Sequence, residues 1–157
     1  MASDKQPRRH LAVASDHAGL SLKLQLVAHL KAAGHQVTDF GCATAESVDY
    51  PDHGAPAARA VAAGECELGL LVCGTGIGMS MVANKVAGVR AALCHTEWEA
   101  RATRSHNDAN VLCLGERVVG PGLAEGILDT FLETGYEGGR HARRVEKITA
   151  LEGTGRP

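Results

Sequence analysis

A glycine-rich turn that follows an apolar run is the feature that most restricts the fold of this chain. Residues 70–80 read Leu-Leu-Val-Cys-Gly-Thr-Gly-Ile-Gly-Met-Ser, with glycines at 74, 76 and 78. The apolar run is typical of a buried strand, and a helical pattern follows the glycines. Glycine lets the backbone adopt a positive φ and approach a ligand closely, and the first turn of a helix has free N–H groups. The stretch therefore predicts a strand, a tight turn and a helix that hold an anionic oxygen beside a thiol.

The rest of the chain alternates apolar runs with helical patterns. We expect strands at 10–15, 36–40, 68–73, 89–94 and 110–114. Helices are expected over 20–33, from the end of a loop at 41–52 to about 63, from the glycine turn to about 87, from 96 towards 105, between 121 and 135, and over 140–151. This order predicts one α/β domain, Rossmann-like and three-layered, whose five-stranded parallel sheet carries helices on both faces. We place the domain at 10–152, after a disordered lead-in over 1–9 and before a frayed tail over 153–157.

Composition excludes several classes of protein. The net charge of −2 gives no general attraction to nucleic acid, and no apolar run approaches the roughly 20 residues that span a bilayer. The five cysteines are odd in number and form no Cys-x-x-Cys pair. Their spacing does not match a zinc site, and with no secretory signal they predict reduced thiols in a cytoplasm.

Polar residues follow several of the expected strands. Asp16 and His17 come after the first strand, Cys73 after the third and His95 after the fourth. In parallel sheets, ligands bind at these carboxyl ends. His106-Asn107 precedes the fifth strand instead and lies at the opposite end of the sheet. It can join the same site only if a second subunit supplies it, which favours a dimer with shared sites.

The glycine turn has alternative interpretations. Gly74 and Gly76 match the first two glycines of a dinucleotide-binding fingerprint, but Met79 occupies the position of the third. The turn also follows the third strand rather than the first. A dinucleotide-dependent oxidoreductase is therefore disfavoured. No Gly-Lys-Ser/Thr follows, so the turn is not a P-loop. Cys73 can be a packing residue, as we expect of Cys94 and Cys113, or a thiolate favoured by the start of the helix.

Other candidates also have structural interpretations. Asp16 and His17 can form a helix-capping turn, His106 can end a helix, and Tyr50 can anchor a loop. Arg140 and Arg144 share one helix face. They suit a phosphate, whose oxygens match the guanidinium fork, or they form a solvated basic face.

A set of motifs in fixed order narrows these alternatives. The motifs are Ser-Asp-His-Ala-Gly (15–19), Asp-Tyr-Pro-Asp (49–52), Cys-Gly-Thr-Gly-Ile-Gly-Met-Ser (73–80), Ala-Asn-Lys-Val-Ala-Gly-Val-Arg-Ala (83–91), His-Asn-Asp-Ala-Asn-Val-Leu (106–112), Gly-Glu-Arg-Val-Val-Gly (115–120) and Tyr-Glu-Gly-Gly-Arg-His (136–141). From about residue 11 to 151 the sequence resembles ribose-5-phosphate isomerase type B, within the group that also holds the galactose-6-phosphate isomerase subunits. Some relatives use a glutamate in place of the cysteine. Cys73 puts this chain with the cysteine type.

The resemblance implies metal-independent aldose–ketose isomerisation of a phosphorylated sugar, with no cofactor. It makes Cys73 the base that moves a proton between carbons 2 and 1 through an enediolate, and His106 the acid/base that opens the sugar ring. Thr75 would orient the substrate or relay the proton, and Asp16 would bond the ring oxygen or a hydroxyl. Backbone N–H groups of Gly74, Gly76 and Gly78 would stabilise the enediolate oxygen.

The remaining implied roles concern binding and assembly. The phosphate would be held by His17, Arg117, Arg140 and Arg144, while Asn107 would bond substrate hydroxyls and Tyr50 would line the pocket. The family is dimeric with sites between subunits, so a homodimer, or a tetramer built from it, is implied, with the C-terminal helix packing on the partner. Ribose 5-phosphate is the substrate that we expect first. Erythrulose 4-phosphate, allose 6-phosphate and galactose 6-phosphate are alternatives, as is a non-catalytic sugar-phosphate sensor. Specificity would depend on residues 46–48 and 95–98.

Overall fold

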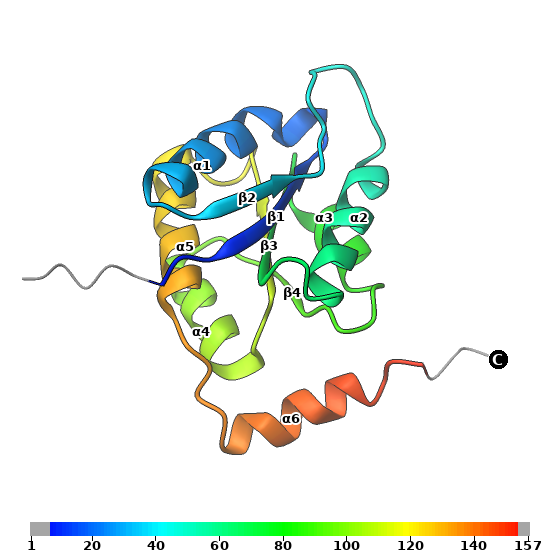
Figure 1. The fold of residues 1–157 in the computed structure, drawn as a ribbon, viewed down its shortest axis with the longest axis vertical. Helices are drawn as coiled ribbons and strands as arrows, with labels where there is room; N and C mark the ends of the chain where they lie inside the picture. The colour runs from blue at the N-terminus through cyan, green and yellow to red at the C-terminus, as the bar shows by residue number, and fades with distance from the viewer. Residues whose placement is uncertain (1–6, 154–157) are drawn as a thin grey trace, which may run out of the picture.

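The computed structural model describes residues 7–153 and contains the expected five-stranded parallel sheet (Figure 1). The strand order is β2-β1-β3-β5-β4, and every neighbouring pair is parallel. The strands are β1 (His10–Ser15), β2 (Gln36–Asp39), β3 (Leu68–Cys73), β4 (Ala91–Leu93) and β5 (Val111–Gly115). The central strand β3 ends at Cys73. The glycine turn therefore lies at the middle of the carboxyl edge of the sheet, by which we mean the side at which the parallel strands end.

Helices cover both faces of the sheet, as expected for a three-layer domain. They are η1 (His17–Gly19, a single 3-10 turn), α1 (Leu20–Ala32), α2 (Tyr50–Ala62), α3 (Ile77–Ala83), α4 (Glu97–Asn107), α5 (Pro121–Glu133) and α6 (Arg140–Thr149). One hydrophobic core joins the sheet to α1, α4 and α5, and a second joins it to α2 and α3. Along β3, Leu70 and Val72 face the first core, whereas Leu71 and Cys73 face the second. Alternation along the strand therefore directs the Cys73 side chain towards the α2 and α3 layer.

Among the boundaries that differ from those expected, two are set by asparagine side chains that bind the backbone and one by a residue in the left-handed conformation. The helix after the glycine turn ends at Ala83 rather than near 87, where the Asn84 amide bonds the backbone N–H and C=O of Ala91. Strand β4 is shortened because the Asn110 side chain bonds the N–H of Arg90 and the C=O of Gly88. Helix α4 continues through Asn107 and ends at Asp108, whose φ of 47° is left-handed.

The second helix also begins earlier than expected, at Tyr50 instead of after residue 52. Pro51 lies in its first turn, where a missing N–H costs nothing. Tyr50 therefore projects from a helix start and not from a loop. The expected lead-in and tail fall largely outside the described residues, although within the lead-in Arg9 forms a 3.0 Å ion pair with Glu67.

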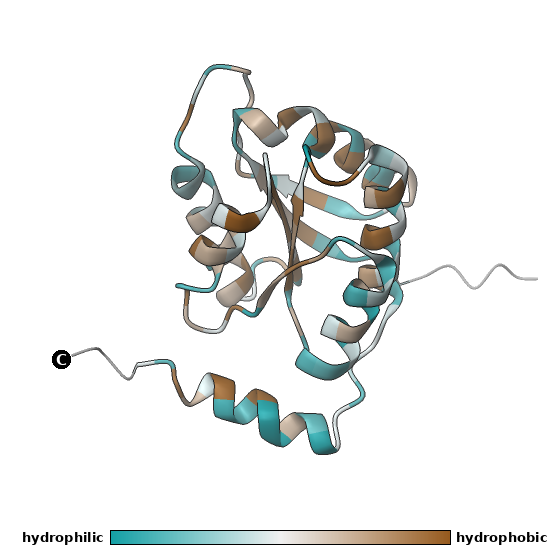
Figure 2. Cartoon of the chain, turned by 180° about the vertical axis from the view of Figure 1, so that it is seen from behind, coloured by the Kyte–Doolittle hydropathy of each residue, from teal (hydrophilic) through white to brown (hydrophobic). Residues whose placement is uncertain are grey.

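Helix α6 stands apart from the three layers (Figure 1). Its first turn contacts the end of α4, and beyond its last turn Glu152 accepts a hydrogen bond from the N–H of Gly88. Between these two points a groove of about 830 Å³ separates α6 from the domain. In Figure 2 most of α6 is hydrophilic, whereas the central strands of the sheet, drawn above it, are largely hydrophobic. Among residues 7–153, none of the helices combines the length and the apolarity that a membrane crossing requires.

Candidate active site

The turn after β3 is built around the thiol of Cys73. The backbone N–H of Gly76 donates a 3.0 Å hydrogen bond to the Cys73 Sγ. Gly76 has a φ of +77°, and a Cβ at this position would lie 2.5 Å from the Leu93 side chain and 2.9 Å from the Leu114 carbonyl carbon. Only glycine can therefore form this turn. The Cys73 sulfur therefore has a fixed hydrogen-bond donor, supplied by the turn itself.

The neighbouring residues complete the turn. The hydroxyl of Thr75 accepts a 3.3 Å hydrogen bond from the N–H of Ile77, and the Thr75 side chain is exposed. Within the described residues, the N–H of Gly78 has no hydrogen-bond partner, as is usual in the first turn of a helix. Gly78 therefore presents a free donor two residues after the N–H that bonds the thiol.

Two other cysteines have no such environment. Burial raises the pKa of the Cys94 thiol to about 12, with a further contribution from the charge of Glu99. Burial also raises the pKa of the Cys113 thiol. Both thiols stay protonated at neutral pH and serve as small apolar residues of the core.

Tyr50 packs directly on the glycine turn from the start of α2. A Cβ built on Gly78 would lie 2.7 Å from the tyrosine ring, so the ring rests on the glycine backbone. The same two helices meet again where Gly54 lies against the sulfur of Met79, at 2.6 Å from a built Cβ. The side chain of Tyr50 therefore forms a wall beside the turn.

Asp16 and His17 lie at the same edge of the sheet, one strand away. The carboxylate of Asp16 is 6% exposed, and its Oδ1 accepts 3.0 Å hydrogen bonds from the N–H groups of Ala18 and Gly19. This is the capping turn that the sequence offered as an alternative, and within residues 7–153 its second oxygen takes no hydrogen bond. The Nδ1 of His17 accepts a 3.1 Å bond from the N–H of Val48. A neutral His17 ring therefore carries its proton on Nε2.

Arg117 completes the group at this edge from the loop after β5. The loop is fixed because the N–H of Arg117 bonds the C=O of Gly74 at 3.0 Å. A Cβ on Gly74 would lie 3.5 Å from the guanidinium Nη1, so the arginine extends over the start of the glycine turn. We call these residues the carboxyl-end group: Asp16, His17, Tyr50, Cys73, Gly74, Thr75, Gly76, Gly78 and Arg117.

The other four predicted site residues lie at the opposite edge of the sheet. His106 and Asn107 form the last turn of α4, and the C=O of Asn107 accepts a 3.1 Å bond from Arg90 just before β4 begins. Arg140 and Arg144 are exposed on α6, whose first turn contacts this end of α4. We call His106, Asn107, Arg140 and Arg144 the amino-end group. The sequence placed His106 and Asn107 here, but it did not show that the two arginines accompany them.

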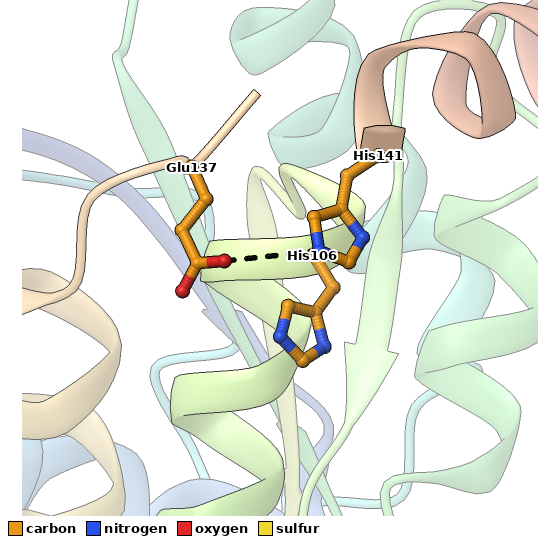
Figure 3. A group of neighbouring side chains, drawn as sticks. All are labelled: His106, Glu137 and His141. Atoms are coloured by element: carbon orange, nitrogen blue, oxygen red, sulfur yellow. Dashed lines mark ion pairs between the residues drawn. The ribbon is translucent and has the colours of Figure 1, made fainter. Parts of the chain in front are cut away.

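His141 is a residue of this end that sequence reasoning missed. It lies between the two arginines on α6, is 6% exposed, and stacks on His106 (Figure 3) with ring centroids 4.4 Å apart and planes 11° from parallel. Its Nε2 lies 3.7 Å from the Glu137 carboxylate. The spacing of Glu137 and His141, four residues apart, was a signal available in the motif at 136–141.

The same three side chains are the types that bind zinc. The ligand atoms of His106, Glu137 and His141 lie within 4.8 Å of one another, and two histidines with a glutamate form a known zinc set. However, the lone pairs of an imidazole lie in the ring plane, and in two stacked rings they run side by side rather than towards one ion. Arg140 and Arg144 also add positive charge nearby. The arrangement fits a stacked histidine pair better than a metal site.

Comparison with known proteins identifies the family. Residues 11–148 match the Ribose/Galactose Isomerase family. The chain belongs to this family. It is 49% identical over 144 residues to ribose-5-phosphate isomerase B of Escherichia coli K12, covering 92% of this chain and 97% of the relative. It is also 44% identical over 143 residues to a D-erythrulose-4-phosphate isomerase of Pectobacterium atrosepticum, covering 90% and 94%.

Solved structures of the family agree with the fold. The ribose-5-phosphate isomerase B of Clostridium thermocellum superposes with a TM-score of 0.90 at 52% identity, covering 91% of this chain and 97% of that one. The expected five-stranded α/β fold and the expected class, an aldose–ketose isomerase, are thereby confirmed.

Proposed function

We propose that this protein interconverts ribose 5-phosphate and ribulose 5-phosphate, with Cys73 as the base. The observation that carries the proposal is the Gly76 N–H bonded to the Cys73 Sγ, at the end of the central strand. The extent of identity to ribose-5-phosphate isomerase B, over nearly the whole of both chains, supports the choice of substrate.

The carboxyl-end group suits a proton transfer between adjacent carbons. In the aldose-to-ketose direction, the Cys73 thiolate removes the proton on C2 of the open-chain aldehyde, and the electron pair forms the C1–C2 double bond of an enediolate. The proton of the C2 hydroxyl passes to the C1 oxygen, with the Thr75 hydroxyl as the relay, the thiol returns a proton to C1, and C2 becomes the carbonyl carbon. The N–H groups of Gly74 and Gly78 would stabilise the enediolate oxygen, while the N–H of Gly76 supports the sulfur. These proton transfers need no redox or metal cofactor, so we expect activity in the presence of a chelator.

Substrate binding needs groups from both edges of the sheet. His17, with Nε2–H as a donor, and Arg117 would contact the phosphate from the carboxyl-end group. The free Oδ2 of Asp16 would accept from the hydroxyl that the ring oxygen becomes when the ring opens, or from a neighbouring hydroxyl, and Thr75 would orient the substrate. Arg140 and Arg144 would complete the phosphate site, Asn107 would bond hydroxyls, and His106 would open the ring as a general acid/base.

One chain cannot bring these two groups together, because they lie at opposite edges of its sheet. We infer a homodimer in which the amino-end group of one subunit completes the site of the other. The exposed side chains of Ile77 and Met81 support this inference, since they form an apolar strip on α3 directly behind the glycine turn. The groove of about 830 Å³ beside α6 offers space for a partner's surface. The composition of five thiols suits the cytoplasm, where we place the enzyme.

The first experiment is isomerisation of a panel of sugar phosphates in the presence of a chelator. Efficient conversion of ribose 5-phosphate would support both the reaction and the substrate. Turnover of erythrulose 4-phosphate or of a hexose 6-phosphate, without turnover of ribose 5-phosphate, would retain the mechanism and change the substrate. Erythrulose 4-phosphate is included because the Pectobacterium relative is named as its isomerase. Binding without turnover of any member of the panel would contradict the proposal and favour a sugar-phosphate sensor.

A further inference from the structure

The imidazole ring of His106 packs against a second ring, that of His141. The two rings stack at a centroid distance of 4.4 Å and an angle of 11° (Figure 3). His106 comes from the last turn of α4 and His141 from the first turn of α6. His106 is partly exposed, whereas His141 is 6% exposed. The buried ring therefore supports one face of the accessible ring.

His141 is itself held in place from two sides. Its backbone N–H bonds the C=O of Gly138 at 3.0 Å, and the N–H of Glu137 bonds the C=O of Ser105 at 3.0 Å. The second of these bonds ties the segment before α6 to α4, one residue before His106. The Glu137 carboxylate lies 3.7 Å from the His141 Nε2. The stack is thus fixed by backbone bonds as well as by ring contact.

The charges around the stack act on His141. Burial lowers the pKa of His141, and the neighbouring His106, Arg140 and Arg144 lower it further, against an opposing contribution from Glu137. These groups come from α4, from the segment before α6 and from α6 itself. His141 is therefore neutral at neutral pH, and it packs an uncharged aromatic face against His106.

From this geometry we propose that His141 is a positioning residue, which holds the imidazole of His106 in the orientation needed to open the ring of a cyclic aldose phosphate. The inference rests on the proposed function of His106. It adds a residue that does not touch the reacting atoms and that acts through the ring it supports.

The proposal predicts an effect on only one step. An aldopentose 5-phosphate is largely a closed furanose and must be opened before isomerisation. A 2-ketopentose 5-phosphate cannot form a furanose, because its C5 oxygen carries the phosphate, so its C1 proton can be exchanged through the enediolate without ring opening. Weakening His106 should therefore slow conversion of ribose 5-phosphate and spare exchange at C1 of ribulose 5-phosphate.

The test compares these two reactions in His141→Ala, His141→Phe and His106→Ala. Conversion of ribose 5-phosphate is followed by steady-state kinetics, and exchange at C1 of ribulose 5-phosphate in D₂O by NMR. His106→Ala sets the full effect, expected at about 10²-fold on conversion. His141→Ala should slow conversion by about 10-fold or more and exchange by less than about 3-fold, mainly through kcat. His141→Phe keeps a flat ring and should restore conversion to within about 3-fold of wild type.

A matched control is His29→Ala, since His29 also pairs with an acidic residue, Asp129 at 2.7 Å, but lies on α1. It should change neither reaction. Equal loss of conversion and exchange in His141→Ala, with a raised KM, would mean that His141 only anchors α6 and its arginines, and would overturn the inference. Unchanged conversion in His141→Ala would overturn it as well. If the wild-type protein catalysed neither reaction, the proposed function itself would fail.

Discussion

The backbone N–H of Gly76 points at the sulfur of Cys73, 3.0 Å away, from a turn that only glycine can form. The Cys73 thiol also faces the second core, but it lies at the end of the central strand with a fixed donor, whereas burial raises the pKa of the Cys94 and Cys113 thiols. Its position beside the glycine turn therefore distinguishes Cys73 from Cys94 and Cys113.

Replacement of Cys73 should remove catalysis and spare binding. Cys73→Ala eliminates the base, so kcat for ribose 5-phosphate should fall by about 10³-fold. The Kd of ribose 5-phosphate, measured by calorimetry, should stay within about 3-fold because the phosphate contacts are elsewhere. Cys66→Ala is the matched control, since Cys66 is also buried but precedes β3 at the other edge of the sheet. Retained turnover in Cys73→Ala would show that another group is the base.

Contact between Tyr50 and Gly78 predicts a coupled pair of substitutions. Gly78→Ala places a Cβ within 2.7 Å of the tyrosine ring and should destabilise the fold by about 1–3 kcal/mol. The loss of unfolding free energy caused by Gly78→Ala should be smaller in a protein that also carries Tyr50→Ala. Urea denaturation of the single and double variants should then give a coupling energy of about 1 kcal/mol. Additive effects would show that the ring does not rest on Gly78. Gly122→Ala, at a helical glycine with no atom within 4 Å of a built Cβ, is the control.

The sequence predicted the sheet and the position of Asp16, His17 and Cys73 at the carboxyl ends of its strands, because both depend on local patterns. Apolar runs that end in Asp16 or Cys73 fix which edge of a parallel sheet these residues occupy. Element boundaries were harder to predict where one side chain binds distant backbone. Asn84 ends α3 through bonds to Ala91, and nothing within the helix itself signals that contact.

The stack of His141 on His106 was not predictable from local patterns, because it joins two helices through a link of irregular structure. The same holds for the place of Arg140 and Arg144. Their spacing showed that they share a helix face, but the edge of the sheet at which that helix lies depends on the contact between α6 and α4. The motif at 136–141 contained these residues without their three-dimensional relationship.

A buried lysine provides a test of the fold at the edge of the sheet. Lys23 is 1% exposed, and its ammonium bonds both carboxylate oxygens of Asp39, at 2.9 and 3.0 Å, and the C=O of Cys42 at 2.6 Å. Asp39→Asn should cost about 3 kcal/mol because it leaves a buried charge unpaired. Adding Lys23→Met should recover part of that loss. The exposed pair of Arg9 and Glu67 is the control, and Glu67→Gln should cost less than about 1 kcal/mol in the same denaturation assay.

The lowered pKa of His141 predicts a pH-dependent contact between α6 and α4. The unfolded histidine, with a pKa of about 6.5, takes up a proton more readily than the folded one. Its contribution to stability is thus complete above that pH and is lost as the pH falls through the lowered folded value. Amide protection factors over residues 137–145, corrected for intrinsic exchange, should decline between about pH 7.5 and 5. In His141→Phe this decline should be absent. An equal decline in both proteins would assign it to another group.

Sharing of sites between subunits can be tested by complementation. Cys73→Ala and His106→Ala subunits carry defects at opposite edges of the sheet, so each homodimer should be inactive. In a mixed dimer, one of the two sites receives both wild-type groups. Random assembly makes half of the dimers mixed, and activity should return to about a quarter of the wild-type value. Coexpression with two affinity tags allows the mixed dimer to be isolated, where about half the wild-type activity is expected.

The matched control mixes Cys73→Ala with Asp16→Ala subunits. Both defects lie in the carboxyl-end group, so the two changes fall in different sites of the mixed dimer and neither site is whole. Recovery should then be absent. Absence of recovery with His106→Ala would show that each chain supplies its own complete site. Recovery in the control would show instead that Cys73 and Asp16 of one site come from different subunits.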